Sequence, residues 1–227
     1  MADELKDGVW LLRLKGFLNW PVNAYLVNDD GTLTLIDSGM PRDASLIRNE
    51  LMELGYGLRD VDRVLITHYD LDHFGGLLRL APELDADIYA GGVDARFLSG
   101  DLKPPLLNHK GAFHRLLSAF VTDLPVQKVS DGERVGGFVA YHTPGHNPGH
   151  TIYVNESVDV GLLGDLVWEQ EGSLTTPIWL DSYNMNRLRQ SIRDIAPRVP
   201  EFDIACVGHG EPLRNGSEEL RKLASSL

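Results

Sequence analysis

Histidine and aspartate side chains gather in one short segment of the chain. Residues 65–76 read Leu-Ile-Thr-His-Tyr-Asp-Leu-Asp-His-Phe-Gly-Gly, and four metal-binding side chains fall within this run: His68, Asp70, Asp72 and His73. Imidazole and carboxylate groups are ligands of zinc, iron and manganese, and zinc needs them at about 2.0–2.2 Å. The segment therefore predicts a metal centre, with a solvated polar loop at a strand end as the alternative.

The elements around this segment would hold its side chains in place. The apolar run 64–66 predicts a buried strand, and Gly75-Gly76 followed by 77–80 predicts a turn into a helix. His68 and Asp70 are two residues apart, so on an extended backbone they point to the same side. Asp72 and His73 come where the chain turns into the helix and can aim at a second point nearby.

The segment resembles the metal-binding signature of the metallo-β-lactamase superfamily, usually His-x-His-x-Asp-His followed by Gly-Gly. Other family landmarks follow in the same order along nearly the whole chain: Asp37-Ser38-Gly39 before the segment, then Thr143-Pro144-Gly145-His146, Gly164-Asp165 and Gly208-His209-Gly210. One landmark alone would be weak evidence, whereas the ordered series is specific. The chain departs from the family at Asp70, where most members have a second histidine.

The resemblance implies two divalent metal ions, most simply zinc, in a shared site. One ion would be held by His68, Asp70, His146 and Asp165, and the other by Asp72, His73, His209 and the same Asp165. Such ions lie about 3.5–4 Å apart and share a water or hydroxide, whose lowered pKa makes it a nucleophile without Ser or Cys. Asp72 is the expected catalytic residue, relaying a proton to the leaving group.

Asp70 changes this expectation because it replaces a neutral imidazole by an anionic oxygen donor. A less acidic bound water and a preference for manganese or iron over zinc would follow from the charge and hardness of the ligand set. The alternative is that the first metal position is weak and only one ion binds tightly.

Further polar residues are expected around the ligands. By the same resemblance, Asp37 orients the ligand loop through hydrogen bonds, with a simple turn aspartate as the alternative. His142 and His150 have structural or orienting roles. His109 and His114 are interpreted as surface or helix-packing histidines in preference to substrate contacts.

The periodicity of the remaining chain predicts a mixture of strands and helices. Strands are expected at 9–14, 23–27, 32–36, 87–90, 137–142, 151–155, 159–163 and 203–207, and helices at 41–54, 92–98, 110–121, 183–195 and 218–225. A hairpin turn is expected at 29–31. The resemblance turns this mixture into a fold: α+β, a four-layer αββα sandwich of the metallo-β-lactamase type, with the ligands at strand ends.

Composition limits the classes of partner. With 227 residues and 43% hydrophobic content, we expect one domain spanning residues 1–227. The formal charge of −12 disfavours binding to nucleic acid. Asp outnumbers Glu and Arg outnumbers Lys, which suggests the hypothesis of a halophilic source. Cys206, the only cysteine, is expected to be a core residue and not a nucleophile.

No apolar run reaches the roughly 18–20 residues of a membrane span, and the acidic residues 1–7 lack the apolar core of a secretory signal. We therefore expect a cytoplasmic protein that is not bound to membranes and acts on a small molecule. The oligomeric state is left open between a monomer and a homodimer.

The favoured function is a metal-dependent hydrolase of a small ester, thioester or lactone, like the glyoxalase II and acyl homoserine lactonase branches of the family. The alternatives are a phosphodiesterase or ribonuclease of the tRNase Z type, and a non-hydrolytic metal or redox protein such as an iron sulfur dioxygenase. A β-lactamase in the strict sense is disfavoured by Asp70. Trp20 could form an apolar flap over the site, opposite Trp168, Trp179 and Tyr183, although packing explains all of these equally well.

Overall fold

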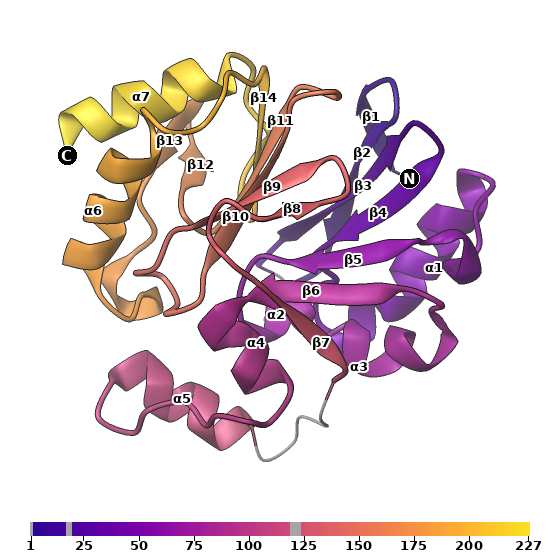
Figure 1. The fold of residues 1–227 in the computed structure, drawn as a ribbon, viewed down its shortest axis with the longest axis horizontal. Coiled ribbons are helices and arrows are strands. Elements are labelled where there is room, and N and C mark those ends of the chain that lie inside the picture. The colour runs from indigo at the N-terminus through magenta and orange to yellow at the C-terminus, as the bar shows by residue number, and fades with distance from the viewer. Residues whose placement is uncertain (1, 17–19, 119–123) are drawn as a thin grey trace.

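The computed structural model describes residues 2–16, 20–118 and 124–227. Within these ranges the chain forms four layers, in which two β-sheets lie face to face and helices cover the outer side of each (Figure 1). This arrangement confirms the predicted αββα sandwich.

The N-terminal sheet holds seven strands in chain order. They are β1 (Asp3–Lys6), β2 (Val9–Leu14), β3 (Val22–Asp29), β4 (Thr32–Ile36), β5 (Arg63–Ile66), β6 (Asp87–Gly91) and β7 (Val126–Val129). The first four pair antiparallel, and β4 to β7 pair parallel. The hairpin predicted at 29–31 joins β3 to β4.

The second sheet has the order β14-β11-β10-β9-β8. Its strands are β8 (Arg134–Val135), β9 (Phe138–His142), β10 (Thr151–Asn155), β11 (Val160–Gly164) and β14 (Ile204–Val207). Only the β11–β14 pair is parallel. A separate hairpin of β12 (Trp168–Gln170) and β13 (Ser173–Thr175) follows β11. The patterns of these short strands, and those of β1, β7 and β8, were too weak to predict.

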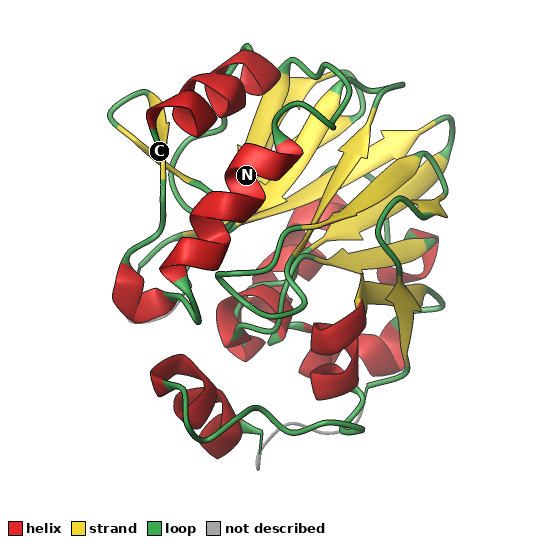
Figure 2. Cartoon of the chain, turned by 60° about the vertical axis from the view of Figure 1, so that its left-hand side comes forward, coloured by secondary structure: helices red, strands yellow, loops and turns green. Residues whose placement is uncertain are grey.

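Helices flank both sheets, as Figure 2 shows. They are α1 (Ala44–Glu53), α2 (Leu71–Phe74), α3 (Leu77–Leu80), α4 (Gly92–Leu98), α5 (His109–Leu117), α6 (Met185–Ile195) and α7 (Gly216–Ser226), with 3₁₀ turns at Pro41–Asp43, Leu58–Asp60, Ala81–Glu83 and Trp179–Asp181. The end of the helix predicted at 110–121 lies outside the described residues. No described helix is long and apolar enough to cross a membrane.

Three buried clusters of apolar residues separate the four layers. One lies between the N-terminal sheet and α1, α3 and α4, a second between the sheets, and a third between the C-terminal sheet and α6 and α7. Neighbouring residues of β2 and β3 alternate between the first two clusters, as a strand buried on both faces requires. Cys206 lies in the cluster between the sheets, and burial raises the pKa of its thiol, so the residue is part of the core.

Gly75 and Gly76 join α2 to α3 through close packing. Both have helical backbone angles, so the predicted turn is in fact a continuation of the helical path. A Cβ atom on Gly76 would lie 2.0 Å from the carbonyl oxygen of Ser38. The missing side chain therefore allows the helix that carries Asp72 and His73 to rest directly on the loop after β4.

We predict that Gly76→Ala lowers the free energy of unfolding by about 1–3 kcal/mol or more, because the added methyl group forces the backbone of residues 37–39 away. Gly57→Ala is the matched control, since a Cβ there meets only one side-chain oxygen, at 3.5 Å. The control should change stability by less than about 0.5 kcal/mol in urea unfolding. Equal effects of both substitutions would contradict this role of Gly76.

Candidate metal centre

The predicted ligands converge at one edge of the sandwich. His68 and Asp70 follow β5, Asp72 and His73 lie in α2, His146 lies between β9 and β10, and Asp165 and His209 follow β11 and β14. Four groups have ligand atoms within 4.8 Å of one another: His68, Asp70 and His146; His68, His73 and Asp165; Asp72, His73 and His209; and His146, Asp165 and Asp181, the last of which was not among the predicted ligands. The fold thus brings the side chains of the motifs together in a dense cluster of imidazole and carboxylate groups.

Asp37 orients two of the imidazoles. Its Oδ2 accepts a hydrogen bond from His73 Nδ1 at 2.8 Å and another from the Thr67 hydroxyl at 2.7 Å. Since that hydroxyl donates to Asp37, its oxygen accepts from His68 Nδ1, at 2.9 Å. Both rings are therefore held with Nε2 free to bind a metal, which is the orienting role expected for Asp37.

The other side of the cluster is also held by backbone contacts. His209 Nδ1 donates to the carbonyl of Pro21 at 2.7 Å, which again leaves Nε2 as the free nitrogen. Asn23 anchors this loop, because its side chain donates to the carbonyls of Val207 and Gly210. His150 Nε2 accepts from the backbone N–H of Asp165, so the structural role expected for His150 is to fix that carboxylate.

Several buried atoms of the cluster fit a metal ion. His68 Nε2, His73 Nε2 and Asp165 Oδ1 have no hydrogen-bond partner. Asp165 oxygens lie 3.5 Å from His73 Nε2 and 3.4 Å from His209 Nε2. Ligands of a tetrahedral ion at about 2.1 Å are roughly 3.4 Å apart, so these atoms are spaced for a shared cation.

Electrostatics supports the same conclusion. Burial alone would lower the pKa of His73, but the carboxylates of Asp165 and Asp37 raise it to about 10. The carboxylates of Asp165 and Asp37 therefore create a negative potential at His73, which favours a cation there. Burial, together with His73, lowers the pKa of His68 well below its ordinary value, which keeps that ring neutral and able to bind a cation.

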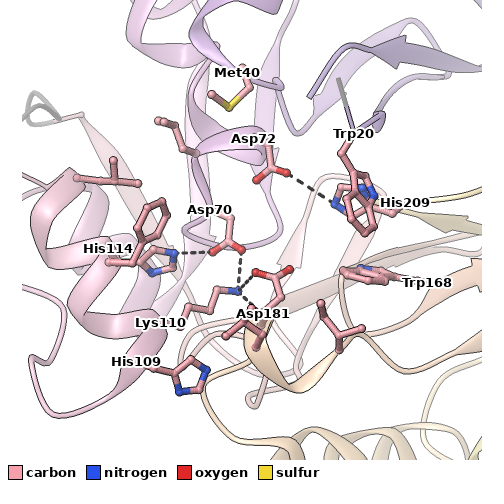
Figure 3. A pocket seen from close by; sticks show the side chains of 15 residues that line it. Trp20, Met40, Asp70, Asp72, His109, Lys110, His114, Trp168, Asp181 and His209 are labelled. Carbon is pink, nitrogen blue, oxygen red and sulfur yellow. Dashed lines mark hydrogen bonds and ion pairs between the residues drawn. The ribbon is translucent and has the colours of Figure 1, made fainter. Parts of the chain in front are cut away.

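Asp70 has a different environment. Its Oδ1 accepts from Asn147 Nδ2 at 2.7 Å and lies 3.1 Å from His114 Nε2. Its Oδ2 lies 2.7 Å from Lys110 Nζ (Figure 3). Although burial opposes ionisation, Lys110, His68 and His114 hold the pKa of Asp70 well below its usual range. Asp70 is therefore an ionised, fully hydrogen-bonded carboxylate.

Lys110 and His114 both come from α5, and sequence reasoning missed their place in the site. Lys110 is only 5% exposed, and His114 only 3%. Burial alone would lower the pKa of Lys110, but the Asp70 and Asp181 carboxylates raise it, so the group is an ammonium. His114 is a buried packing residue, as one half of its interpretation predicted, and its imidazole also reaches Asp70. His109 is exposed beside Trp179 and lines the pocket. An i, i+4 pair of Lys and His was the only local signal.

Asp94 in α4 joins two of the ligand loops. Its carboxylate accepts from the backbone N–H of Tyr69 at 2.9 Å and of Gly149 at 2.7 Å. These two groups belong to the loop of His68 and the loop of His146. A buried carboxylate that no motif marks thus fixes the distance between the two loops.

A pocket of about 570 Å³ opens onto the cluster. Most of its lining side chains are apolar: Trp20, Met40, Leu71, Phe113, Leu117, Trp168, Ile178 and Leu180. Its polar lining includes Asp70, Asp72, Lys110, Asp181 and His209 (Figure 3). The rings of Trp20 and Trp168 lie 6.3 and 5.2 Å from that of His209. Of the aromatic residues for which a wall and simple packing were equally open, these two line the pocket. Trp179 is exposed and does not line it, and the Tyr183 hydroxyl contacts His114 Nδ1.

Comparison with known proteins identifies the family and the fold. A family model described as the metallo-beta-lactamase superfamily matches residues 18–226. A metallo-beta-lactamase family protein from Thermus thermophilus has a TM-score of 0.72 and 23% identity, covering 98% of this chain and 80% of that one.

Three curated proteins extend the comparison. A probable metallo-hydrolase of Bacillus subtilis (YybB) is 26% identical over 90% of this chain and 87% of its own. The hydroxyacylglutathione hydrolase GloC of Haemophilus influenzae is 26% identical over 88% and 92%. An atrochrysone carboxyl ACP thioesterase of Aspergillus fumigatus is 30% identical over 75% of this chain but 35% of its own.

We predict that Asp37→Asn lowers metal affinity by about 10–100-fold, because an amide has one accepting oxygen, whereas the carboxylate uses both of its oxygens for Thr67 and His73. Asp30→Asn is the matched control, since Asp30 shares the left-handed backbone (φ 51° against 58°) but lies in an exposed turn. Competition against a chromophoric chelator measures both affinities. Unchanged affinity in Asp37→Asn would contradict the orienting role.

Proposed function

The chain belongs to the metallo-beta-lactamase superfamily, and we propose that it is a metal-dependent hydrolase of a small ester, thioester or lactone. One observation carries the proposal: buried imidazole and carboxylate atoms without hydrogen-bond partners face one another beside an apolar pocket. Unpaired polar atoms cost free energy when buried, so a chain that retains several together is built to bind a cation.

The ligands proposed for the ion nearest the pocket are Asp72, His73, Asp165 and His209. When bound by these residues, a divalent ion would supply a water of lowered pKa and a positive charge beside the carbonyl oxygen of a substrate. Asp37 keeps His73 in the metal-binding tautomer, and the Pro21 carbonyl does the same for His209.

Asp72 is proposed to move a proton to the leaving group. It lines the pocket, and its Oδ2 lies 3.7 Å from His209 Nε2. Burial raises the pKa of its carboxyl group, despite the opposing effect of His73. A raised pKa favours a carboxyl group that can take up a proton and release it within the pocket.

The pocket lining supports an acyl substrate over a phosphodiester. Among the described residues that line it, Lys110 is the only lysine or arginine, and its amine already contacts Asp70 and Asp181. A phosphodiester needs cationic groups that are free to bind its oxygens. The apolar wall suits the acyl chain of an ester or thioester, and the names of the Haemophilus and Aspergillus relatives support the same class.

Asp165→Asn should reduce turnover of ester, lactone or acyl thioester substrates by more than about 100-fold and lower the bound metal, because Asp165 contacts both imidazoles of the site. Chelation should abolish activity, and zinc, manganese or iron should restore it. The exposed Asp101→Asn is the control. Turnover unaffected by chelation would contradict the proposal, and oxygen uptake by an iron-loaded protein without hydrolysis would favour the redox alternative.

Phe113→Asp and Ile178→Asp should each lower kcat/KM for a medium-chain acyl thioester by about tenfold or more, and change that for an acetyl thioester little. Each removes apolar contact area worth roughly 1.5 kcal/mol or more from the pocket wall. Leu107→Asp is the control, because Leu107 is fully exposed and does not line the pocket. Equal losses for both chain lengths would mean that the wall does not bind the acyl chain.

A further inference from the structure

The two predicted metal positions are not equivalent. The position near Asp72 and His209 has ligand atoms without partners, whereas the position near Asp70 and His146 already contains a cation. We propose that the ammonium group of Lys110 takes the place of one metal ion, so that the centre holds a single divalent ion. The inference rests on the proposed metal centre, but not on the substrate.

All three N–H bonds of the ammonium have an acceptor. Lys110 Nζ lies 2.7 Å from Asp70 Oδ2, 2.8 Å from His146 Nε2 and 2.8 Å from the carbonyl oxygen of Asp181. An ammonium group has three donors and no acceptor, so these contacts satisfy it completely. Lys110 therefore has no spare hydrogen with which to bind a substrate, and its contacts are those of a built-in cation.

These contacts use the atoms that a metal would need. His146 Nε2 lies 2.8 Å from Lys110 Nζ and 3.1 Å from Asp70 Oδ2. Because an ammonium group can only donate, the hydrogen bond from Lys110 requires the His146 proton on Nδ1 and occupies the Nε2 lone pair through which that ring would bind an ion. Both oxygens of Asp70 also have partners. Lys110 contacts Oδ2, and Asn147 and His114 contact Oδ1. Of the predicted ligand atoms that face this position alone, only His68 Nε2 is without a hydrogen-bond partner. A second divalent ion does not fit the residues as they are arranged.

The helix that carries Lys110 is held in place. Asn108 caps α5 by accepting from Gly111 N–H, and its amide donates to the carbonyl of Tyr183. His114, one turn after Lys110, lies between Asp70 and the Tyr183 hydroxyl. Because the side chains of Asn108 and His114 hold α5 on either side of Lys110, and Lys110 is itself buried, its amine is fixed beside Asp70.

Charge balance agrees with one metal ion. Asp70, Asp72 and Asp165 carry one negative charge each, and one ammonium with one divalent ion neutralises all three. A second divalent ion at this position would place two further positive charges beside the Lys110 ammonium, a like-charge contact that is costly in a buried cluster. The exchange of the family's histidine for Asp70 and the presence of Lys110 thus form one feature, a buried ion pair in place of a metal site.

Metal content tests the inference without any substrate. Wild-type protein saturated with zinc and then gel-filtered should hold about one ion per chain by mass spectrometry, and Lys110→Met should hold about two. Titration with Co²⁺, followed by its visible absorption, should saturate at the same equivalents. Lys128→Met, at an exposed lysine of β7, is the control and should match the wild type.

Asp70→His/Lys110→Met covers the case in which Lys110→Met fails to fold because it leaves Asp70 buried without its partner. This double variant removes both charges and should also bind about two ions. Two ions in the wild type, or one in variants that fold, would overturn the role given to Lys110. No ion in any of the proteins would instead contradict the proposed metal centre.

Discussion

Compensation of buried negative charge is the constraint on which the centre depends. Asp37, Asp70 and Asp165 are each less than one-tenth exposed, and an ionised carboxylate is costly to bury unless positive groups or hydrogen-bond donors surround it. The chain meets this constraint in two ways within one cluster. Lys110 neutralises Asp70, and Asn147 donates a hydrogen bond to it. Asp37 instead holds His73 through Nδ1, and Asp165 faces the Nε2 atoms of His73 and His209, which are left for a metal.

The frame around the cluster consists of backbone and buried polar contacts at strand ends. β5 ends beside β4 in one sheet and β11 beside β14 in the other, so loops from both sheets meet at the same edge. Asp94 fixes two of these loops to each other, and Asn23 fixes the His209 loop to β3. Each ligand is thus attached to regular structure within a few residues, which holds its geometry tightly enough for a metal site.

The apolar patterns were enough to predict a mixture of strands and helices, and the family resemblance carried by the motifs was enough to predict the sandwich and to group His68, His73, Asp165 and His209. Local sequence could not reveal Lys110, because its contact with Asp70 joins α5 to the loop after β5 across 40 residues. Spacing within α5 also gives no direction, since a lysine and a histidine one turn apart are usual on a solvated helix. The close packing of Gly76 could not be predicted from local sequence either, because it depends on the carbonyl group of Ser38, which is distant in the chain.

The place of Asp70 changes how the metal chemistry should be understood. A preference for hard ions follows only if Asp70 binds the ion, whereas an Asp70 paired with Lys110 leaves two imidazoles and two carboxylates, a set that suits zinc, iron and manganese alike. The Lys110 ammonium, whose three N–H groups already have acceptors, also cannot bind a substrate atom as a metal ion with an open coordination position would. On the proposal of a single metal ion, the reacting group of a substrate binds at the end of the pocket beside His209, Trp20 and Trp168, and its apolar part extends towards Phe113 and Leu117 of α5.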